Sequence, residues 1–216
     1  MKKGLMISML ICSTASIADT SEATSENYNA SEDTNENYTT SGASSGFIFG
    51  VGLANIDPDV AANAQVDESA VSIRIGWEYR PSDYIIGAGI SGLIYDDKAD
   101  YDQLVIDQYG NTSTEKSSAD AFGFYIEGGY EYSINPYFYT DFIGGYEQTL
   151  DSSRAISNCG DCYDSDIDVD AGLYINPRIT IIFQSTAFLS LGYQHYLNGD
   201  IDNNIMLNIG FGAQQH

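Results

Sequence analysis

Several residue types are scarce in this chain, and each scarcity excludes a class of function. Only 8 of the 216 residues are Lys or Arg, against 31 Asp and Glu, so the formal net charge is −23. Nucleic-acid binding requires a basic surface, so no nucleic-acid partner is expected. Beyond the first 18 residues, no apolar run approaches the roughly 20 residues of a membrane-spanning helix.

The first residues have the features of a secretory signal peptide. Two lysines precede the apolar run Leu5–Cys12, and small residues follow up to Ala18. This order of a basic, an apolar and a small-residue region predicts a signal peptide over residues 1–18. The alternative, lipidation of Cys12, is disfavoured because a bulky isoleucine precedes that cysteine.

Residues 19–45 are acidic, almost free of apolar side chains, and repetitive. The segment SEATSENYNA at Ser21–Ala30 is followed by the related SEDTNENYTT at Ser31–Thr40. Such a segment cannot bury enough apolar surface to offset the entropy lost on ordering. We predict a disordered tail, which serves either as a periplasmic spacer or cell-wall ligand or as a neutral extension.

The strongest pattern in the chain is the alternation in VDAGLYINPRITIIF at Val169–Phe183. Every second residue from Val169 is apolar, and the residues between them are mostly polar or small. Successive side chains of a strand point to opposite faces, so this is a strand with one apolar face. Its length exceeds an ordinary strand of about 5–6 residues and suits a tilted crossing of about 30 Å of hydrocarbon.

Seven other segments alternate in the same way. The eight predicted strands are 47–55, 71–80, 84–95, 121–132, 137–149, 169–183, 187–196 and 203–213. The connections are alternately long and short, as in outer-membrane barrels with short periplasmic turns and longer outer loops. We therefore predict an all-β fold, an eight-stranded antiparallel up-and-down transmembrane β-barrel over residues 46–213, with the tail in the periplasm. A bulge is expected near Gly92, where the alternation breaks.

Aromatic residues gather near the predicted strand ends, as in the girdles of membrane barrels. One girdle lies by the short turns, and the second would contain Tyr95, Phe122, Tyr146 and Tyr193. The alternative is a soluble eight-stranded carrier, which would place its apolar residues inside. Here the apolar set lies opposite Arg, Asp, Glu and Asn, which favours lipid outside and a polar interior.

A family resemblance rests on five segments of the sequence. They are the Gly-aromatic strands GFIFGVGLA, GFYIEGGYEY and FIGGYE, the turn GWEYRPSDYIIGAGIS and the last strand NIMLNIGFG. From Phe47 to Phe211 the chain resembles the small outer-membrane β-barrels of Gram-negative bacteria, the OmpA-like and OmpX/Ail-like group. The resemblance implies an eight-stranded barrel in the outer membrane. The group includes adhesion and stress-resistance proteins, so an adhesive role is an expectation by analogy.

Six charged side chains are predicted to point into the barrel. They are Arg74, Glu78, Glu127, Asp141, Asp170 and Arg178. An interior of eight strands is just wide enough for side chains, and an unpaired buried charge is costly. We therefore expect these residues to pair across the interior as a polar plug; the alternative is an ion path through the barrel.

The CGDC segment places Cys159 and Cys162 in a predicted outer loop. In an oxidising compartment a small disulfide is the favoured interpretation. A redox catalyst would need an activated thiolate, usually at a helix N-terminus, and zinc would need two further ligands.

The predicted outer loops are acidic but also contain apolar residues. The acidic residues lack the glycine and terminal glutamate of an EF-hand, so a solvated rim bridged to lipopolysaccharide by divalent cations is favoured over a defined calcium site. The apolar residues proposed for partner contact are Tyr101, Leu104, Val105, Ile106 and Tyr109.

Enzymatic chemistry has little support in the sequence. The only histidines are His195, predicted to point outward, and the terminal His216. Nucleophilic catalysis needs a base held against a nucleophile, and neither histidine has such a neighbour in the sequence. We expect a monomeric, non-enzymatic protein without cofactor, with outer-membrane lipid, lipopolysaccharide and a host or cell-surface ligand as partners. Its role would be structural or adhesive, and the alternative is a narrow channel for ions or small solutes.

Overall fold

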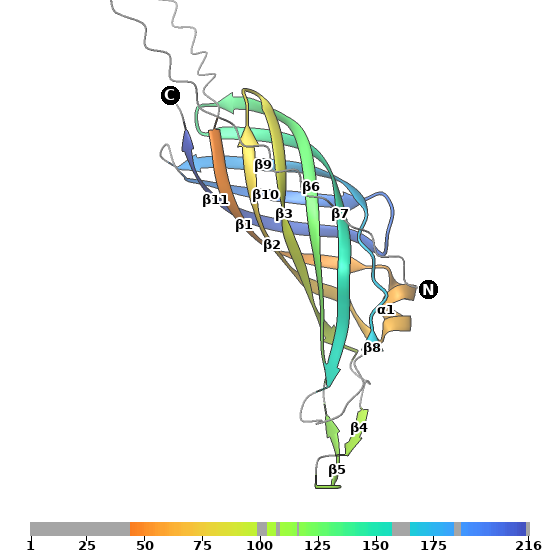
Figure 1. Cartoon of the computed structure of the whole chain (residues 1–216). Helices are drawn as coiled ribbons and strands as arrows, with labels where there is room; N and C mark the ends of the chain where they lie inside the picture. Colours follow the sequence, from red (N-terminus) through yellow and green to blue (C-terminus); the bar gives the residue numbers. More distant parts are fainter. Residues whose placement is uncertain are drawn as a thin grey trace, which may run out of the picture. The chain divides into compact units, whose positions relative to one another are not determined.

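The computed structural model describes residues 44–98, 103–106, 109–115, 117–156, 165–183 and 187–214. The barrel strands are β1 (Ser44–Ile56), β2 (Val66–Arg80), β3 (Tyr84–Asp97), β6 (Ser117–Asn135), β7 (Phe138–Ile156), β9 (Leu173–Phe183), β10 (Ala187–Tyr196) and β11 (Ile201–Gln214). Each of these strands pairs antiparallel with the next along the chain, and β1 pairs with β11 to close the barrel (Figure 1). The predicted eight-stranded antiparallel up-and-down barrel is confirmed.

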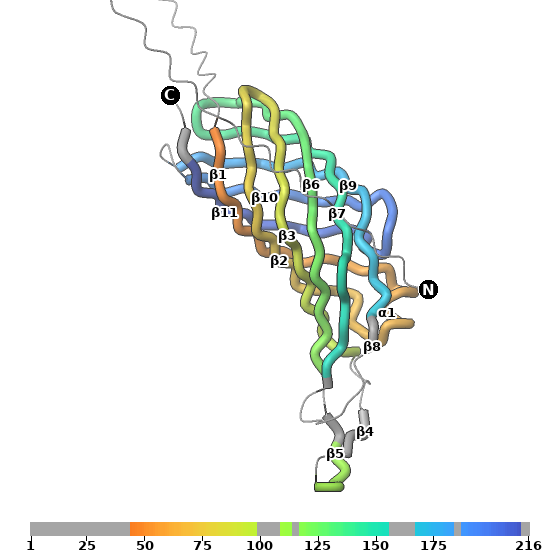
Figure 2. Tube along the Cα trace, in the orientation of Figure 1, coloured from red at the N-terminus to blue at the C-terminus, as the bar shows by residue number. Residues whose placement is uncertain are grey.

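The two ends of the barrel differ in their connections. At the turn end, short turns join β2 to β3, β6 to β7 and β9 to β10. At the loop end, longer connections contain the helix α1 (Pro58–Ala64), the hairpin of β4 (Gln103–Ile106) with β5 (Thr112–Glu115), and the short strand β8 (Ser165–Asp166), which pairs with β7. Figure 2 shows α1 at this same end of the traced barrel.

The outer face of the barrel is apolar, as the alternation predicts. Phe142, Ile179 and Leu207 lie on three different strands and are 62%, 56% and 42% exposed. The intervening positions of the same strands, such as Asp141 and Thr180, are fully buried in the interior. This is the arrangement of a transmembrane barrel, in which apolar side chains contact lipid and polar ones are enclosed.

Several strands are longer than predicted, and β6 and β7 exceed the prediction most. β6 and β7 each contain 19 residues and pair from Ser117↔Ile156 to Asn135↔Phe138. The prediction ended these strands where their outward residues become polar. The strands continue through these polar residues, which include Asp120 and Asp151. The β6–β7 hydrogen-bonded ladder is therefore longer than the stretch with apolar outward residues.

The connection predicted as a polar loop at 57–68 contains a helix. The Asp57 carboxylate accepts hydrogen bonds from the backbone N–H groups of Asp59, at 2.9 Å, and Val60, at 3.3 Å. Pro58 follows this N-cap, where its missing N–H costs nothing. The helix ends at Gln65, whose φ of 57° is left-handed. No helix of the described residues is long and apolar enough to cross a membrane.

The predicted strand 169–183 begins later than expected, at Leu173. Residues 167–172 are irregular, so the alternation that holds from Leu173 does not extend back through them. As a result, Val169, predicted to face lipid, is buried inside, and Asp170, predicted to point inward, is exposed. The prediction of Asp170 as an interior charge is therefore wrong.

The expected bulge near Gly92 is absent, because β3 pairs regularly with both neighbours there. The irregularity lies instead on β7 beside Leu150, where the pairing skips from Thr149 to Asp151. Since β3 alternates without a break, Tyr95 points inward and is 3% exposed, so it is not part of an outer aromatic girdle. Phe122 and Tyr193 are exposed, as that girdle requires.

One proline lies within a central strand. Pro177 of β9 pairs with Phe142 of β7, but the β9–β10 ladder skips this position and resumes at Ile175↔His195. Proline has no N–H to donate, so it cannot supply a ladder hydrogen bond to β10 at this point.

Candidate functional site

The candidate site is the barrel interior, whose side chains form charged clusters toward the turn end and an apolar layer toward the loop end. Both sets come from the inward positions of the same strands. β2, for example, contributes Ala70 to the apolar layer and Arg74 and Glu78 to the charged clusters. The composition of the interior therefore changes along the barrel axis.

The turn-end cluster consists of Glu78, Arg80, Glu131, Asp141 and Arg178. Arg178 lies between two carboxylates: its Nε donates to Asp141 Oδ2 at 2.7 Å and its Nη2 to Glu78 Oε2 at 2.9 Å. Arg80 donates to Glu78 Oε1 at 2.6 Å and forms a second ion pair with Glu131. Two arginines are therefore shared among three carboxylates drawn from three strands. Such charge-assisted bonds are strong and directional, so they fix the interior geometry.

The central cluster consists of Arg74, Glu127, Glu147, Tyr174 and Tyr196. Arg74 forms an ion pair with Glu147, and its Nη1 lies 3.9 Å from Glu127 Oε2. The Tyr174 hydroxyl donates to Glu127 at 2.8 Å, and the Tyr196 hydroxyl donates to Glu147 at 2.7 Å. The two tyrosines thus complete the coordination of both carboxylates and connect β9 and β10 with β6 and β7.

Aromatic rings fill the remaining space around the arginines. Arg74 lies over the ring of Tyr125, 4.6 Å from its centroid, and Arg80 lies over the ring of Phe188 at 4.9 Å. Gly76 gives Tyr125 room, since a Cβ there would lie 2.2 Å from the Tyr125 hydroxyl oxygen. Cation–π contacts and small residues let large rings fit across a narrow interior.

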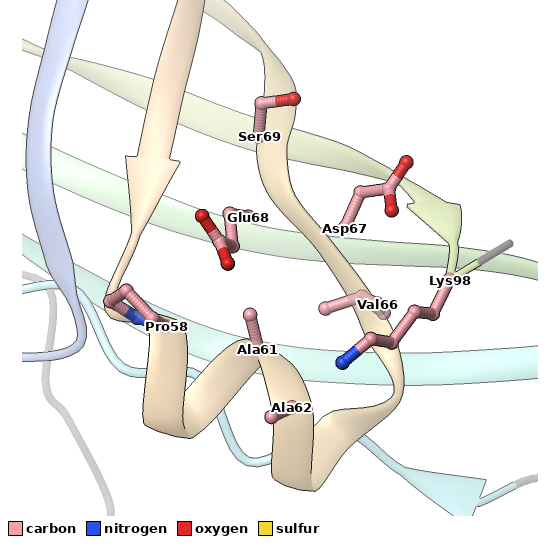
Figure 3. Close-up of a pocket in the computed structure, with 8 residues that line it drawn as sticks. All are labelled: Pro58, Ala61, Ala62, Val66, Asp67, Glu68, Ser69 and Lys98. Atoms are coloured by element: carbon pink, nitrogen blue, oxygen red, sulfur yellow. The ribbon is translucent and has the colours of Figure 1, made fainter.

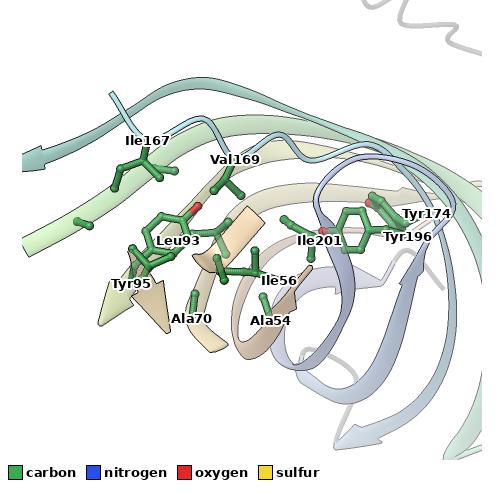
Figure 4. Close-up of a cluster of buried hydrophobic side chains, with 14 residues drawn as sticks. Ala54, Ile56, Ala70, Leu93, Tyr95, Ile167, Val169, Tyr174, Tyr196 and Ile201 are labelled. Atoms are coloured by element: carbon green, nitrogen blue, oxygen red, sulfur yellow. The ribbon is translucent and has the colours of Figure 1, made fainter. Parts of the chain in front are cut away.

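The apolar layer closes the loop end of the interior (Figure 4). Its buried members are Ala54, Ile56, Ala61, Val66, Ala70, Leu93, Tyr95, Ala119, Ala121, Ile167, Val169, Tyr174, Tyr196 and Ile201. Most come from the strands, but Ala61 comes from α1, and Ile167 and Val169 come from the irregular segment before β9. The rings of Tyr174 and Tyr196 pack at 5.5 Å and join this layer to the central cluster below.

An arginine fastens α1 over this layer. Arg154 of β7 donates from Nη2 to the carbonyl oxygens of Ala64 at 2.9 Å and Gln65 at 3.1 Å. The same nitrogen lies 3.5 Å from Asp97 Oδ1 of β3. Asp97 also accepts from the Ser117 backbone N–H at 2.9 Å, so one arginine ties the helix to β3, β6 and β7.

Five of the six charges predicted for the interior lie in the two clusters: Arg74, Glu78, Glu127, Asp141 and Arg178. Asp170 lies outside, where its backbone N–H donates to Asp200 Oδ2 at 2.8 Å. Sequence reasoning missed Arg80, Glu131 and Arg154. The signal for Arg80 was present, because it follows Arg74 and Glu78 at even spacing on β2.

The predicted loop residues are only partly described. Cys159, Cys162 and Tyr101 lie outside the described residues. Leu104, Val105 and Ile106 belong to β4 and pair with Thr114, Ser113 and Thr112 of β5, so this segment forms its own hairpin and does not extend β3. Tyr109 lies next to the hairpin turn and is 81% exposed.

A shallow pocket of about 260 Å³ lies between α1, the start of β2 and the end of β3 (Figure 3). Its lining includes Asp67, Glu68 and Lys98 together with alanines of α1. Within the described part of the chain, no group of three or more His, Cys, Asp or Glu could hold a metal ion. His195 points outward, away from the interior clusters.

The comparisons with known proteins agree with this fold. The family described as "Outer membrane protein beta-barrel domain" matches residues 37–214. The chain belongs to this family and is a small eight-stranded barrel of the outer membrane. No curated protein matches the sequence.

Two similar solved structures are Ail, the attachment invasion locus protein of Yersinia pestis, and Neisserial surface protein A. Ail, solved with the heparin analogue sucrose octasulfate, is 12% identical, with a TM-score of 0.49 over 79% of this chain and 98% of Ail. Neisserial surface protein A is also 12% identical, with a TM-score of 0.48 over 81% of this chain and 99% of that protein.

Proposed function

We propose that this barrel is a non-enzymatic surface protein of the outer membrane, with a structural or adhesive role carried by the connections at its loop end. The main support is the filled interior. Ion-paired clusters occupy the turn-end half, and an apolar layer with α1 over it occupies the loop-end half. A packed interior offers no space for a substrate, so the surface is the place for an interaction.

The orientation proposed here follows from the connections. Outer-membrane barrels have short periplasmic turns and longer outer loops, so the loop end faces outside the cell and the turn end faces the periplasm. In this proposal the acidic tail at 19–45 lies in the periplasm, after removal of a signal peptide at 1–18. The support is that β1, which follows the tail in the sequence, begins at the turn end.

The long strands β6 and β7 carry the interaction surface above the membrane. On β6, the last outward aromatic toward the loop end is Phe122, and the five residues from Ser117 to Ala121 continue past it. At about 3.3 Å per residue these add about 17 Å of strand beyond the lipid-facing band. The connection between β3 and β6 starts from this height and contains the hairpin of β4 and β5.

In this proposal, partner contact is made by Tyr101, Leu104, Val105, Ile106 and Tyr109 in that connection. A disulfide between Cys159 and Cys162 constrains the neighbouring β7–β9 connection, since outer-membrane proteins mature in an oxidising compartment. Acidic side chains at this end contact lipopolysaccharide through divalent cations. The partner is a host or cell-surface ligand, and the barrel acts as a monomer.

The adhesive role is tested by replacing residues 100–115 with a short Gly-Ser linker in the full chain. Bacteria that express this variant should adhere to cultured animal cells less than bacteria with the unchanged chain. The matched control replaces the turn Pro81–Asp83 at the opposite end, which should leave adhesion unchanged. Equal adhesion by all three strains, at equal surface amounts of folded barrel, would reject the adhesive role.

A narrow channel is the second candidate, and one observation favours it. Charged and polar side chains line the interior continuously from Arg80 through Arg178 to Arg74. Such a lining could carry ions if its side chains moved apart. Single-channel recording in planar bilayers separates the two candidates.

A further inference from the structure

The apolar layer is built from the barrel wall and from side chains outside it. The wall contributes four alanines, Ala54, Ala70, Ala119 and Ala121, beside larger residues such as Ile56 and Leu93. Side chains from outside the wall complete the layer, namely Ala61 of α1, and Ile167 and Val169 of the segment before β9. Eight strands enclose just enough room for side chains, so these additions complete the packing.

Below this layer lie charges that water would otherwise reach. Ser72 is the next inward residue of β2 after Ala70, and Arg74 follows it. Arg74 pairs with Glu147, and the rings of Tyr174 and Tyr196 stand between this pair and the loop end. A continuous apolar constriction excludes water because wetting it would cost free energy, and hydrophobic gates in membrane pores use the same effect.

The helix over this layer is held by one side chain from the opposite wall. Arg154 bonds the carbonyl oxygens of Ala64 and Gln65 and pairs with Asp97. α1 otherwise joins the barrel through its own ends, where the Asp57 N–H donates to Asp200 O at 2.8 Å. Without the Arg154 contacts, α1 would keep the backbone hydrogen bonds at its ends, including the Lys98 N–H to Gln65 O at 3.2 Å. It would also keep the packing of Val60, Ala61 and Ala64 against the apolar layer.

We propose that α1 is a lid fastened by Arg154, and that the apolar layer beneath it is the seal that keeps water from the loop end away from the central cluster. Hydrogen bonds to a charged group are stronger than neutral ones, so Arg154 sets how often the lid opens. This inference does not depend on the proposed adhesive function, since it concerns the interior alone.

The test measures the access of a thiol reagent to a cysteine placed just below the seal. All native cysteines are replaced by serine, Ser72→Cys is introduced, and the full chain is folded into lipid vesicles. A small charged methanethiosulfonate should modify S72C slowly. Adding Arg154→Gln should raise the rate about tenfold or more, because it removes the charged donor of two hydrogen bonds. Asp57→Ala, which removes the helix cap without changing a strand, should give a smaller increase.

The matched control is Lys98→Gln, which removes one positive charge at the same end of the barrel without touching the Arg154 contacts. It should leave the labelling rate unchanged, and any access through the turn end is common to all variants. Each variant is first shown to be folded by circular dichroism. Fast labelling of S72C alone would refute the seal. Equal rates in folded R154Q, D57A and S72C alone would refute the lid, and D57A alone decides this point if R154Q does not fold.

Discussion

The turn-end half of the barrel interior is held together by arginines shared between carboxylates, and the loop-end half by alanines, isoleucines and aromatic rings. In the first half, Arg178 reaches Glu78 and Asp141 at 2.9 and 2.7 Å. In the second, Ile56, Val66 and Ile201 belong to the apolar layer and are each no more than 2% exposed. The same strands build both halves, so the difference lies in which inward residues they carry.

The comparison indicates that the two halves respond differently to damage. A buried ion pair that loses one partner leaves an uncompensated charge, whereas an apolar layer that loses a side chain is left with a cavity. The stability of the charged half therefore depends on the chemical identity of its side chains. The stability of the apolar half depends on the volume of its side chains. Substitutions at Arg178, Ile56, Tyr174 and Tyr95 test this difference.

Removing an arginine from the turn-end cluster should lower the free energy of unfolding the most. Arg178→Gln leaves Glu78 and Asp141 buried with less compensation, and it should lower the free energy of unfolding by about 3–5 kcal/mol. Urea unfolding of the barrel in lipid vesicles measures this loss. The control is Lys98→Gln, an exposed cation, for which a change within about 0.5 kcal/mol is expected. A loss below 1 kcal/mol for R178Q would contradict the structural importance of the cluster.

Shortening a side chain of the apolar layer should lower the free energy of unfolding somewhat less than breaking the turn-end cluster. Ile56 belongs to the apolar layer and is 1% exposed, and Ile56→Ala should lower the free energy of unfolding by about 2–5 kcal/mol by creating a cavity. Ile56→Leu, which conserves volume, should cost less than about 1.5 kcal/mol. Equal losses for the alanine and leucine variants would show that volume does not govern this half.

The same chemical change should have opposite signs in the two halves. The Tyr174 hydroxyl bonds Glu127 and Arg74, so Tyr174→Phe should destabilise the barrel by about 1–3 kcal/mol. The buried Tyr95 hydroxyl has no hydrogen-bond partner, so Tyr95→Phe should stabilise it by about 1 kcal/mol. Paired urea-unfolding curves measure both changes, and a shift in the same direction for the two variants would remove the distinction.

The alternation of residues predicted the barrel, its strand order and its lipid-facing side, because period-two patterning directly reflects two different solvents. It also placed Arg74, Glu78, Glu127, Asp141 and Arg178 inside. It did not predict which of these would meet, since pairing across the interior depends on strand register and tilt, which no local pattern encodes.

Errors occurred where the pattern of the lipid-facing band ends. Asp170 was assigned inward by extending the alternation of β9 through an irregular segment, and Tyr95 was assigned outward because the alternation was expected to break at a bulge near Gly92. Arg154 was assigned to a loop because β7 continues above the membrane without apolar outward residues. The helix α1 had a readable signal in Asp57-Pro58, an N-cap followed by proline.

The account depends on an interior that is closed by packed side chains. Single-channel recording of the full chain in planar bilayers tests this claim most directly. A filled interior predicts no steady conductance above that of the bare bilayer at moderate voltage. Large, steady openings of the folded, unmodified barrel would contradict the account and support the narrow channel.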